Sequence, residues 1–199
     1  MNQPHRVIPD LDTLARLFYA DPESLGRFQE VEAADMPARV RKLLAHEHHM
    51  TVTVESHYKT AVDVQVLQTE ITPKHYAREI LLTLQTDGDP DQGDLKKGEP
   101  DQGEADQGDV VQYGIMRINF SFVDEQVRRE IESQETPLGR ILIEHDVLRR
   151  VHLFSLWKIS PSRRLSGLLE LADQAAVYGR TALIYCNDEP AIELLEIVK

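Results

Sequence analysis

Two strand-like segments flank an acidic repeat, and this arrangement constrains the fold more than any other feature of the sequence. Residues 78–85 (Arg-Glu-Ile-Leu-Leu-Thr-Leu-Gln) precede the repeat and residues 110–120 follow it, and both are rich in strand-forming residues. Strands that are adjacent in sequence pair most simply as an antiparallel hairpin. We therefore interpret the two segments as a β-hairpin with an enlarged tip.

The tip of this hairpin, residues 87–109, is a pentapeptide repeat. Glycine recurs every five residues from Gly88 to Gly108, and nine acidic residues stand against two lysines, so the segment carries −7 of the net charge of −12. It contains too few apolar side chains for their burial to offset the conformational entropy that the segment would lose on folding. Closely spaced carboxylates can bind Ca²⁺, but calcium-binding repeats contain a regular large apolar residue that is missing here. We expect a disordered acidic loop rather than a metal site.

The rest of the sheet is predicted from four further segments. In residues 61–68, Val62, Val64 and Val66 alternate with polar residues, as in a half-buried strand. Residues 151–157, 181–185 and 191–198 are also predicted strands. Turn-forming residues at 187–190 make the last two a terminal hairpin.

Five helices are expected outside these strands. Asp10 is predicted to cap the first helix, which has Leu11, Leu14, Leu17 and Phe18 on one stripe. Asp35 is predicted to cap the second helix, with Pro37 in its first turn, and Asp124 to start the third. Pro137 is predicted to open the fourth helix over residues 138–144, and residues 165–176 to form the fifth. The predicted strands form hairpins, the helices are grouped between them, and strands and helices do not alternate regularly as in a parallel sheet. This order of elements predicts an α+β fold: an antiparallel sheet with helices packed mainly on one face.

Composition narrows the class of protein. A chain of 199 residues with 41% hydrophobic residues is long enough for one domain with a core, and the excess of 34 acidic over 22 basic residues disfavours a nucleic-acid partner. The single cysteine, Cys186, cannot form an internal disulfide. No signal-peptide pattern and no apolar run of about 18 residues is found, so we expect a cytoplasmic protein without a membrane span.

Two conspicuous clusters have ordinary interpretations. His46-Glu47-His48-His49 resembles a metal cluster, but Met50 stands where a zinc-protease helix would need its second histidine, so we expect a solvated helix end and no metal. The basic residues after Ser162 are expected to begin a surface helix. No nucleophile elbow, Walker loop or dinucleotide fingerprint is present.

Five segments in order go beyond fold class. They are His49-Met50-Thr51 before the valine strand, Arg78-Glu79-Ile80-Leu81-Leu82, Thr136-Pro137-Leu138-Gly139-Arg140, Tyr178-Gly179-Arg180, and a final hairpin that ends in Leu195-Glu196-Ile197-Val198. This series resembles the chorismate–pyruvate lyase family and its wider superfamily over roughly residues 45 to 198. The resemblance implies a cofactor-independent lyase that removes pyruvate from chorismate and leaves 4-hydroxybenzoate for ubiquinone or other aromatic biosynthesis.

The resemblance also implies roles for four residues. Arg78 matches the position that binds the ring carboxylate, a task that suits the two-pronged guanidinium group. Backbone groups of Met50 and Leu138 would complete the carboxylate site. Glu196 matches the glutamate near the 4-hydroxyl and the ether, where it is predicted to be a proton donor or hydrogen-bond partner.

The sequence departs from the family pattern in three places. His49 replaces the serine of a Ser-Met-Thr segment, the acidic repeat replaces a tight turn, and the last hairpin is one residue longer, so Glu193 competes with Glu196. We prefer Glu196 because the following apolar residues match the family. Residues three apart on a strand point to opposite faces, and we therefore expect Glu193 to face water.

Two functions remain open at this stage. The first is the chorismate lyase, and the second is a non-catalytic domain that binds an aromatic acid or another small molecule, because effector domains of some transcription regulators share the superfamily's fold. Residues 1–44 are predicted to be a helical N-terminal extension and residues 45–199 the lyase-like domain. The oligomeric state cannot be predicted.

Overall fold

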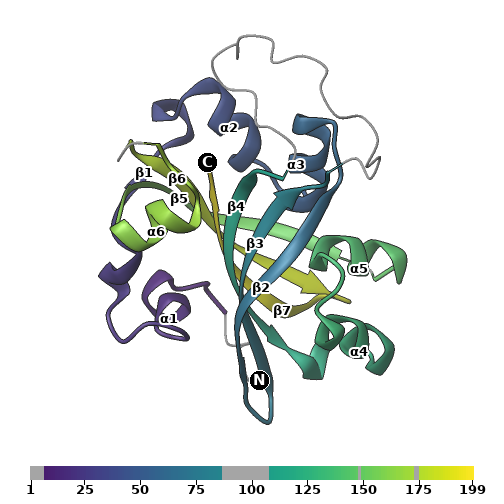
Figure 1. Cartoon of the computed structure of the whole chain (residues 1–199). Helices are drawn as coiled ribbons and strands as arrows, with labels where there is room; N and C mark the ends of the chain where they lie inside the picture. Colours follow the sequence, from purple (N-terminus) through teal and green to yellow (C-terminus); the bar gives the residue numbers. More distant parts are fainter. Residues whose placement is uncertain (1–6, 87–107, 148, 173–174) are drawn as a thin grey trace.

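The computed structural model describes residues 7–86, 108–147, 149–172 and 175–199. Within this part of the chain, seven strands form one antiparallel sheet in the order β1-β5-β6-β7-β4-β3-β2 (Figure 1). The strands are β1 (Gly26–Val31), β2 (Val62–Ile71), β3 (His75–Leu84), β4 (Val110–Asn119), β5 (Arg149–Pro161), β6 (Val177–Cys186) and β7 (Glu189–Val198). The helices are α1 (Leu11–Ala15), α2 (Ala38–Leu44), α3 (Met50–Tyr58), α4 (Glu125–Ser133), α5 (Leu138–Glu144) and α6 (Arg163–Leu168).

Helices cover the two faces of the sheet unequally. Buried residues of α2, α3, α4 and α5 belong to one apolar core, while α1 and α6 contribute to a smaller core on the opposite face (Figure 1). The strands supply both cores by alternation: on β7, Leu194 packs into the larger core and Leu195 into the smaller one. The predicted α+β fold, with helices mainly on one face, is confirmed.

Both predicted hairpins are present. β3 pairs antiparallel with β4, and the stem continues to its end, where the backbone N–H of Leu84 donates to Asp109 O at 3.0 Å. β6 pairs with β7 around a turn in which Asn187 and Asp188 have positive φ angles of 51° and 66°. The acidic repeat, whose disorder was predicted, lies outside the described residues apart from Gly108 and Asp109.

The N-terminal region contains a strand that the sequence interpretation missed. β1 pairs with β5 at one edge of the sheet, from Gly26 opposite Pro161 to Val31 opposite Leu156, so the first 44 residues are not purely helical. The strand is short and half of its six residues are polar, which hides it from a pattern search. Gly26 has a φ of +127°, and a Cβ there would lie 2.3 Å from Ser160 O, so glycine is required where β1 begins.

Helix positions were predicted unevenly. Asp10 and Asp124 cap α1 and α4 through their side chains, and α5 has the predicted bounds. The predicted cap of α2 is wrong: Asp35 lies in a 3₁₀ turn, and the helix starts only after Pro37. Met36 precedes this proline, and helical backbone angles are unfavourable for a residue in that position. The fifth helix, α6, begins at Arg163 behind its N-cap Ser162 and ends at Leu168, well before the predicted end.

α3 was not predicted at all. Its sequence, Met-Thr-Val-Thr-Val-Glu-Ser-His-Tyr, contains four consecutive β-branched residues, and sequence analysis treats it only as a segment that precedes a strand. In the structure Met50 and Val54 are buried in the larger core, so tertiary packing overrides local preference. None of the helices in the described residues is both long and apolar enough to cross a bilayer.

Candidate functional site

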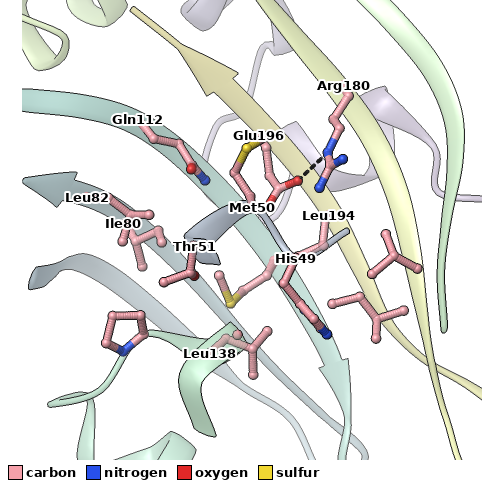
Figure 2. Close-up of a pocket in the computed structure, with 15 residues that line it drawn as sticks. His49, Met50, Thr51, Ile80, Leu82, Gln112, Leu138, Arg180, Leu194 and Glu196 are labelled. Atoms are coloured by element: carbon pink, nitrogen blue, oxygen red, sulfur yellow. Dashed lines mark hydrogen bonds and ion pairs between the residues drawn. The ribbon is translucent and has the colours of Figure 1, made fainter. Parts of the chain in front are cut away.

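A cavity lies between the larger helical layer and the centre of the sheet. Its volume is about 30 Å³, and its wall is formed by β3, β4, β5, β6 and β7 on one side and by the first turns of α3 and α5 on the other (Figure 2). The lining residues are His49, Met50, Thr51, Ile80, Leu82, Gln112, Met116, Pro137, Leu138, Gly139, Val151, Arg180, Ile184, Leu194 and Glu196. The wall is mainly apolar with a few polar groups, as is typical of small-molecule sites.

The N-terminal ends of α3 and α5 meet at this cavity. α3 begins at Met50 and α5 at Leu138, and a Cβ placed on Gly139 would lie only 3.0 Å from Thr51 Oγ1. Backbone N–H groups in a first helical turn have no partner within the helix, and they carry partial positive charge. Met50 and Leu138, the two residues predicted to offer backbone groups, therefore lie at the same wall.

An ion pair contributes to the polar part of the opposite wall. Arg180 of β6 donates from Nε to Glu196 Oε2 at 2.7 Å, and the two residues are register partners on neighbouring strands (Figure 2). Gly179 permits this close approach of β6 and β7, since a Cβ there would lie 2.7 Å from Glu196 O.

The same arginine fixes the connection between α2 and α3. Its Nη1 donates to the carbonyl oxygen of His46 at 2.8 Å, and its Nη2 donates to that of His48 at 3.1 Å. Arg180 is fully buried and its three nitrogen atoms all have partners. It therefore ties residues 46–48, which precede α3, to Glu196 and the sheet.

Arg78 lies beside the cavity rather than in its lining. This β3 residue is fully buried, and its Nε donates to Met116 Sδ at 3.2 Å, while Met116 itself lines the cavity. No hydrogen-bond partner for Nη1 or Nη2 is found among the described residues. Burial lowers the pKa of Arg78 from its usual value, and nearby Tyr76 opposes this shift. The guanidinium group is thus held in the core without a counter-ion from the described chain.

Two further buried polar atoms on this face have no partner in the described part of the chain. They are Gln112 Oε1 and His49 Nε2, and both belong to residues that line the cavity. Burial, helped by the charges of Arg149 and Arg180, lowers the pKa of His49 to about 4, so its ring is neutral at pH 7. Buried polar groups are nearly always hydrogen-bonded in native proteins, so this concentration of unpaired ones indicates a site for a polar ligand.

The two terminal glutamates lie on opposite faces of β7. Glu196 lines the cavity, while Glu193 forms an ion pair with Arg117 on the other face. The expectation that Glu193 faces water is wrong: only 7% of its surface is exposed, and burial raises the pKa of its carboxyl group. A strand in the middle of a sheet that is covered on both faces has no solvent side.

A second buried carboxylate lies on the smaller core side of β3. Glu79 accepts hydrogen bonds from the hydroxyl groups of Tyr19 and Tyr113 and from Gln68 Nε2, the last two at 2.8 Å. Burial and this carboxylate raise the pKa of Tyr113 well above 10, so its hydroxyl stays a donor. Glu79 is fully buried, accepts three hydrogen bonds and does not line the cavity, so we assign it a structural role.

The sequence analysis identified some of the residues of this site. Met50, Leu138 and Glu196 line one cavity and Arg78 contacts its lining, but the roles given to them remain predictions. Arg180 was noted only as part of a motif, although an arginine next to a glycine immediately before a predicted strand was a usable signal. Gln112, a polar residue in the mainly apolar first half of β4, was missed. The described residues hold no group of three or more histidine, cysteine or acidic side chains that could bind a metal ion.

Comparison with known proteins identifies the fold. No family model and no curated protein sequence matches the chain. The crystal structure of PhnF from Mycobacterium smegmatis matches with a TM-score of 0.51 at 11% identity, over 76% of this chain and 63% of that one. The separate effector domain of the same PhnF matches with a TM-score of 0.50 at 10% identity, over 76% and 88% of the two chains. A ligand-binding domain of a putative GntR-family transcriptional regulator from Bordetella bronchiseptica matches with a TM-score of 0.45 at 10% identity, over 69% and 85%.

These matches concern the fold alone. They place the chain in the α+β, chorismate lyase-like fold that the sequence predicts, and neither a family model nor a curated sequence supports chorismate lyase itself. The chain spans 63% of the length of the PhnF chain and 88% of its effector domain.

Proposed function

We propose that this chain is a small-molecule-binding domain whose ligand is an organic carboxylic acid with a flat, largely apolar body. The observation that carries the proposal is the buried guanidinium group of Arg78, which has two donor nitrogens without partners in the described chain. Such a group costs free energy unless an anion pairs with it, and a carboxylate is the anion whose geometry fits its fork.

The shape and polarity of the cavity support the same class of ligand. Apolar side chains from five strands offer a surface for a ring, and the positive end of α3 favours an anion. The likeness to an effector domain also supports binding rather than catalysis.

The present cavity volume of about 30 Å³ holds roughly one water molecule, so a ring must displace side chains. Met50 and Met116 line the cavity, and methionine side chains adapt readily because they are unbranched. We therefore propose that these two side chains move when the ligand binds.

Calorimetric titration tests the proposal with 4-hydroxybenzoate and, as a matched uncharged compound, 4-hydroxybenzamide. The acid is expected to bind and the amide to bind at least 10-fold more weakly, because only the acid gives Arg78 a charged partner. Arg78→Lys should recover part of the affinity that Arg78→Ala loses. Arg140→Ala is the control, because Arg140 already pairs with Glu55 outside the cavity. Equal binding of acid and amide, or unchanged affinity in Arg78→Ala, contradicts the proposal.

A second candidate function is the chorismate lyase, and the position of Glu196 in the cavity wall favours it. In that reaction the ether bond of chorismate breaks, pyruvate leaves and the ring becomes aromatic. Incubation of the purified protein with chorismate should then give 4-hydroxybenzoate and pyruvate in equal amounts, and Glu196→Gln should lower turnover by roughly 100-fold. Binding of 4-hydroxybenzoate without any turnover of chorismate supports the binding domain and rejects the enzyme.

A further inference from the structure

Gln112 presents an unpaired hydrogen-bond acceptor to the cavity. This β4 residue lines the cavity, and only 2% of its surface is exposed. Its Oε1 atom is buried and has no hydrogen-bond partner among the described residues, and its amide is directed toward the other lining residues (Figure 2). A buried carbonyl oxygen without a partner costs free energy, so a ligand that donates a hydrogen bond to it gains affinity.

Arg78 and Gln112 lie at opposite ends of a row of residues on one face of the sheet. In the pairing of β3 with β4, Arg78 is opposite Met116. Four residues farther along, Leu82 is opposite Gln112, and the register between the two pairs is regular. Residues four apart on a strand point to the same face, and at about 3.3 Å per residue their Cα atoms are about 13 Å apart. The hydrogen bond from Arg78 Nε to Met116 Sδ keeps the guanidinium group at the Met116 end.

The wall between these two ends is apolar. Gly114 lies midway between Gln112 and Met116 on the same face of β4, and its partner on β3 is Ile80. Ile80 packs over this glycine, because a Cβ on Gly114 would lie 3.3 Å from Ile80 Cγ1, and Ile80 also lines the cavity. Charged donors at one end, an apolar middle and an acceptor at the other end suit a ligand with the complementary groups in the same order.

Glu196, the carboxylate in the cavity wall, lies closer to Arg78 along the strands than Gln112 does. It is opposite Gly114 in the pairing of β4 with β7, so it is level with the middle of the row. Its Oε2 atom already accepts the hydrogen bond from Arg180. Gln112 is two residues farther along β4 from Met116, and its oxygen is therefore the acceptor at the end remote from Arg78.

We propose that Gln112 determines ligand specificity: its Oε1 atom accepts a hydrogen bond from a hydroxyl or amino group at the end of the ligand remote from the carboxylate. This inference rests on the proposed function and extends it. The preferred ligands are then ring carboxylic acids that carry a hydrogen-bond donor opposite the carboxylate, and acids without that donor bind more weakly because they leave the buried oxygen unpaired.

Two acids that differ in one substituent test this role. 4-Hydroxybenzoate donates a hydrogen bond, whereas 4-fluorobenzoate has a similar shape but no hydrogen to donate. Dissociation constants are measured by calorimetric titration for the wild type and three variants. Gln112→Met and Gln112→Leu remove the amide, and Gln65→Leu is the control because Gln65 is an exposed glutamine of β2 outside the cavity lining.

The wild type should bind 4-hydroxybenzoate about 2- to 10-fold more tightly than 4-fluorobenzoate, the effect of one hydrogen bond. Both Gln112 variants should lose this preference and still bind 4-fluorobenzoate, because the carboxylate site is intact. Gln65→Leu should keep the preference.

Three results overturn the role of Gln112 alone: equal affinity of the wild type for the two acids, an unchanged preference in the Gln112 variants, or loss of both acids by both variants, which would show a structural role. A wild type that binds neither acid overturns the proposed function as well.

Discussion

Arg180 and Glu196 are paired opposite each other on β6 and β7, and they form an ion pair at 2.7 Å in the wall of the cavity. Arg180 is fully buried, and 7% of the surface of Glu196 is exposed. The conformation of the one carboxylate in the cavity wall therefore depends on a residue that also anchors the segment before α3.

Arg180→Met should destabilise the protein by about 3–5 kcal/mol, because it leaves Glu196 as a buried charge without its partner. Urea unfolding measures the change. The double variant Arg180→Met/Glu196→Leu should recover part of the loss, since it buries no charge. Arg128→Met is the surface control, because its pair with Glu132 is partly exposed and should contribute less than about 1 kcal/mol. If the double variant is less stable than Arg180→Met, the unpaired charge of Glu196 is not the cause of the lost stability.

Arg78→Met should have the opposite effect on stability. The unpaired guanidinium group costs free energy in the ligand-free protein, so an apolar side chain of similar length should raise the free energy of unfolding by about 1–3 kcal/mol. The same variant should lose affinity for 4-hydroxybenzoate. Unfolding and calorimetric titration of one preparation measure both. A variant that is less stable than the wild type would show that Arg78 has a structural role.

Stability should fall as the pH is lowered from 7 to 4. Burial lowers the pKa of both His46 and His49 from 6.5 to about 4, with help from the charge of Arg180. Between these values the unfolded chain binds protons that the folded chain does not, so the contribution is complete above pH 6.5 and declines toward pH 4. Urea midpoints at pH 7, 5.5 and 4.5 should fall steadily. His49→Gln should flatten this decline.

Replacing residues 87–107 with a short Asp-Gly turn should raise the unfolding free energy by no more than about 2 kcal/mol, because 21 residues become two, a little over three halvings of the loop length. The β3–β4 stem is already closed by the hydrogen bonds between Leu84 and residues 108 and 109, and each doubling of loop length costs only about 0.6 kcal/mol. Chemical denaturation of the shortened chain tests this. A shortened chain that does not fold, or a loss of Ca²⁺-dependent thermal stabilisation present in the full chain, contradicts the expectation that the repeat is dispensable.

The sequence predicted those elements whose local pattern agrees with their packing. The hairpin strands and the side-chain caps at Asp10 and Asp124 follow directly from alternation and capping preference. α3 was hidden because its β-branched residues favour strands, and only its burial against the larger core makes it helical. β1 was hidden because an edge strand needs few apolar residues and depends on β5 for its hydrogen bonds.

Several residues of the candidate site could be predicted from the sequence, but the hydrogen bonds and ion pairs between them could not. Alternation along β7 correctly placed Glu193 and Glu196 on opposite faces. The partner of Glu196 could not be predicted, because a bulge between Ile184 and Tyr185 shifts the register that the terminal turn alone would set. The exposure of Glu193 was misjudged because the smaller core, which includes residues of α1, covers a face that was expected to be open.

The adjacent residues Arg78 and Glu79 have a consequence for how the sheet assembles. Their side chains are buried on opposite faces of β3, the arginine beside Met116 and the glutamate among tyrosine hydroxyl groups. A shift of β3 by one residue would exchange the faces and put each charge among groups that cannot solvate it. A short turn normally fixes the pairing of a hairpin, but the long β3–β4 connection imposes no such geometry. The two buried charges therefore favour the observed register of β3 against β4, because a pairing shifted by one residue would place each charge on the wrong face of the sheet.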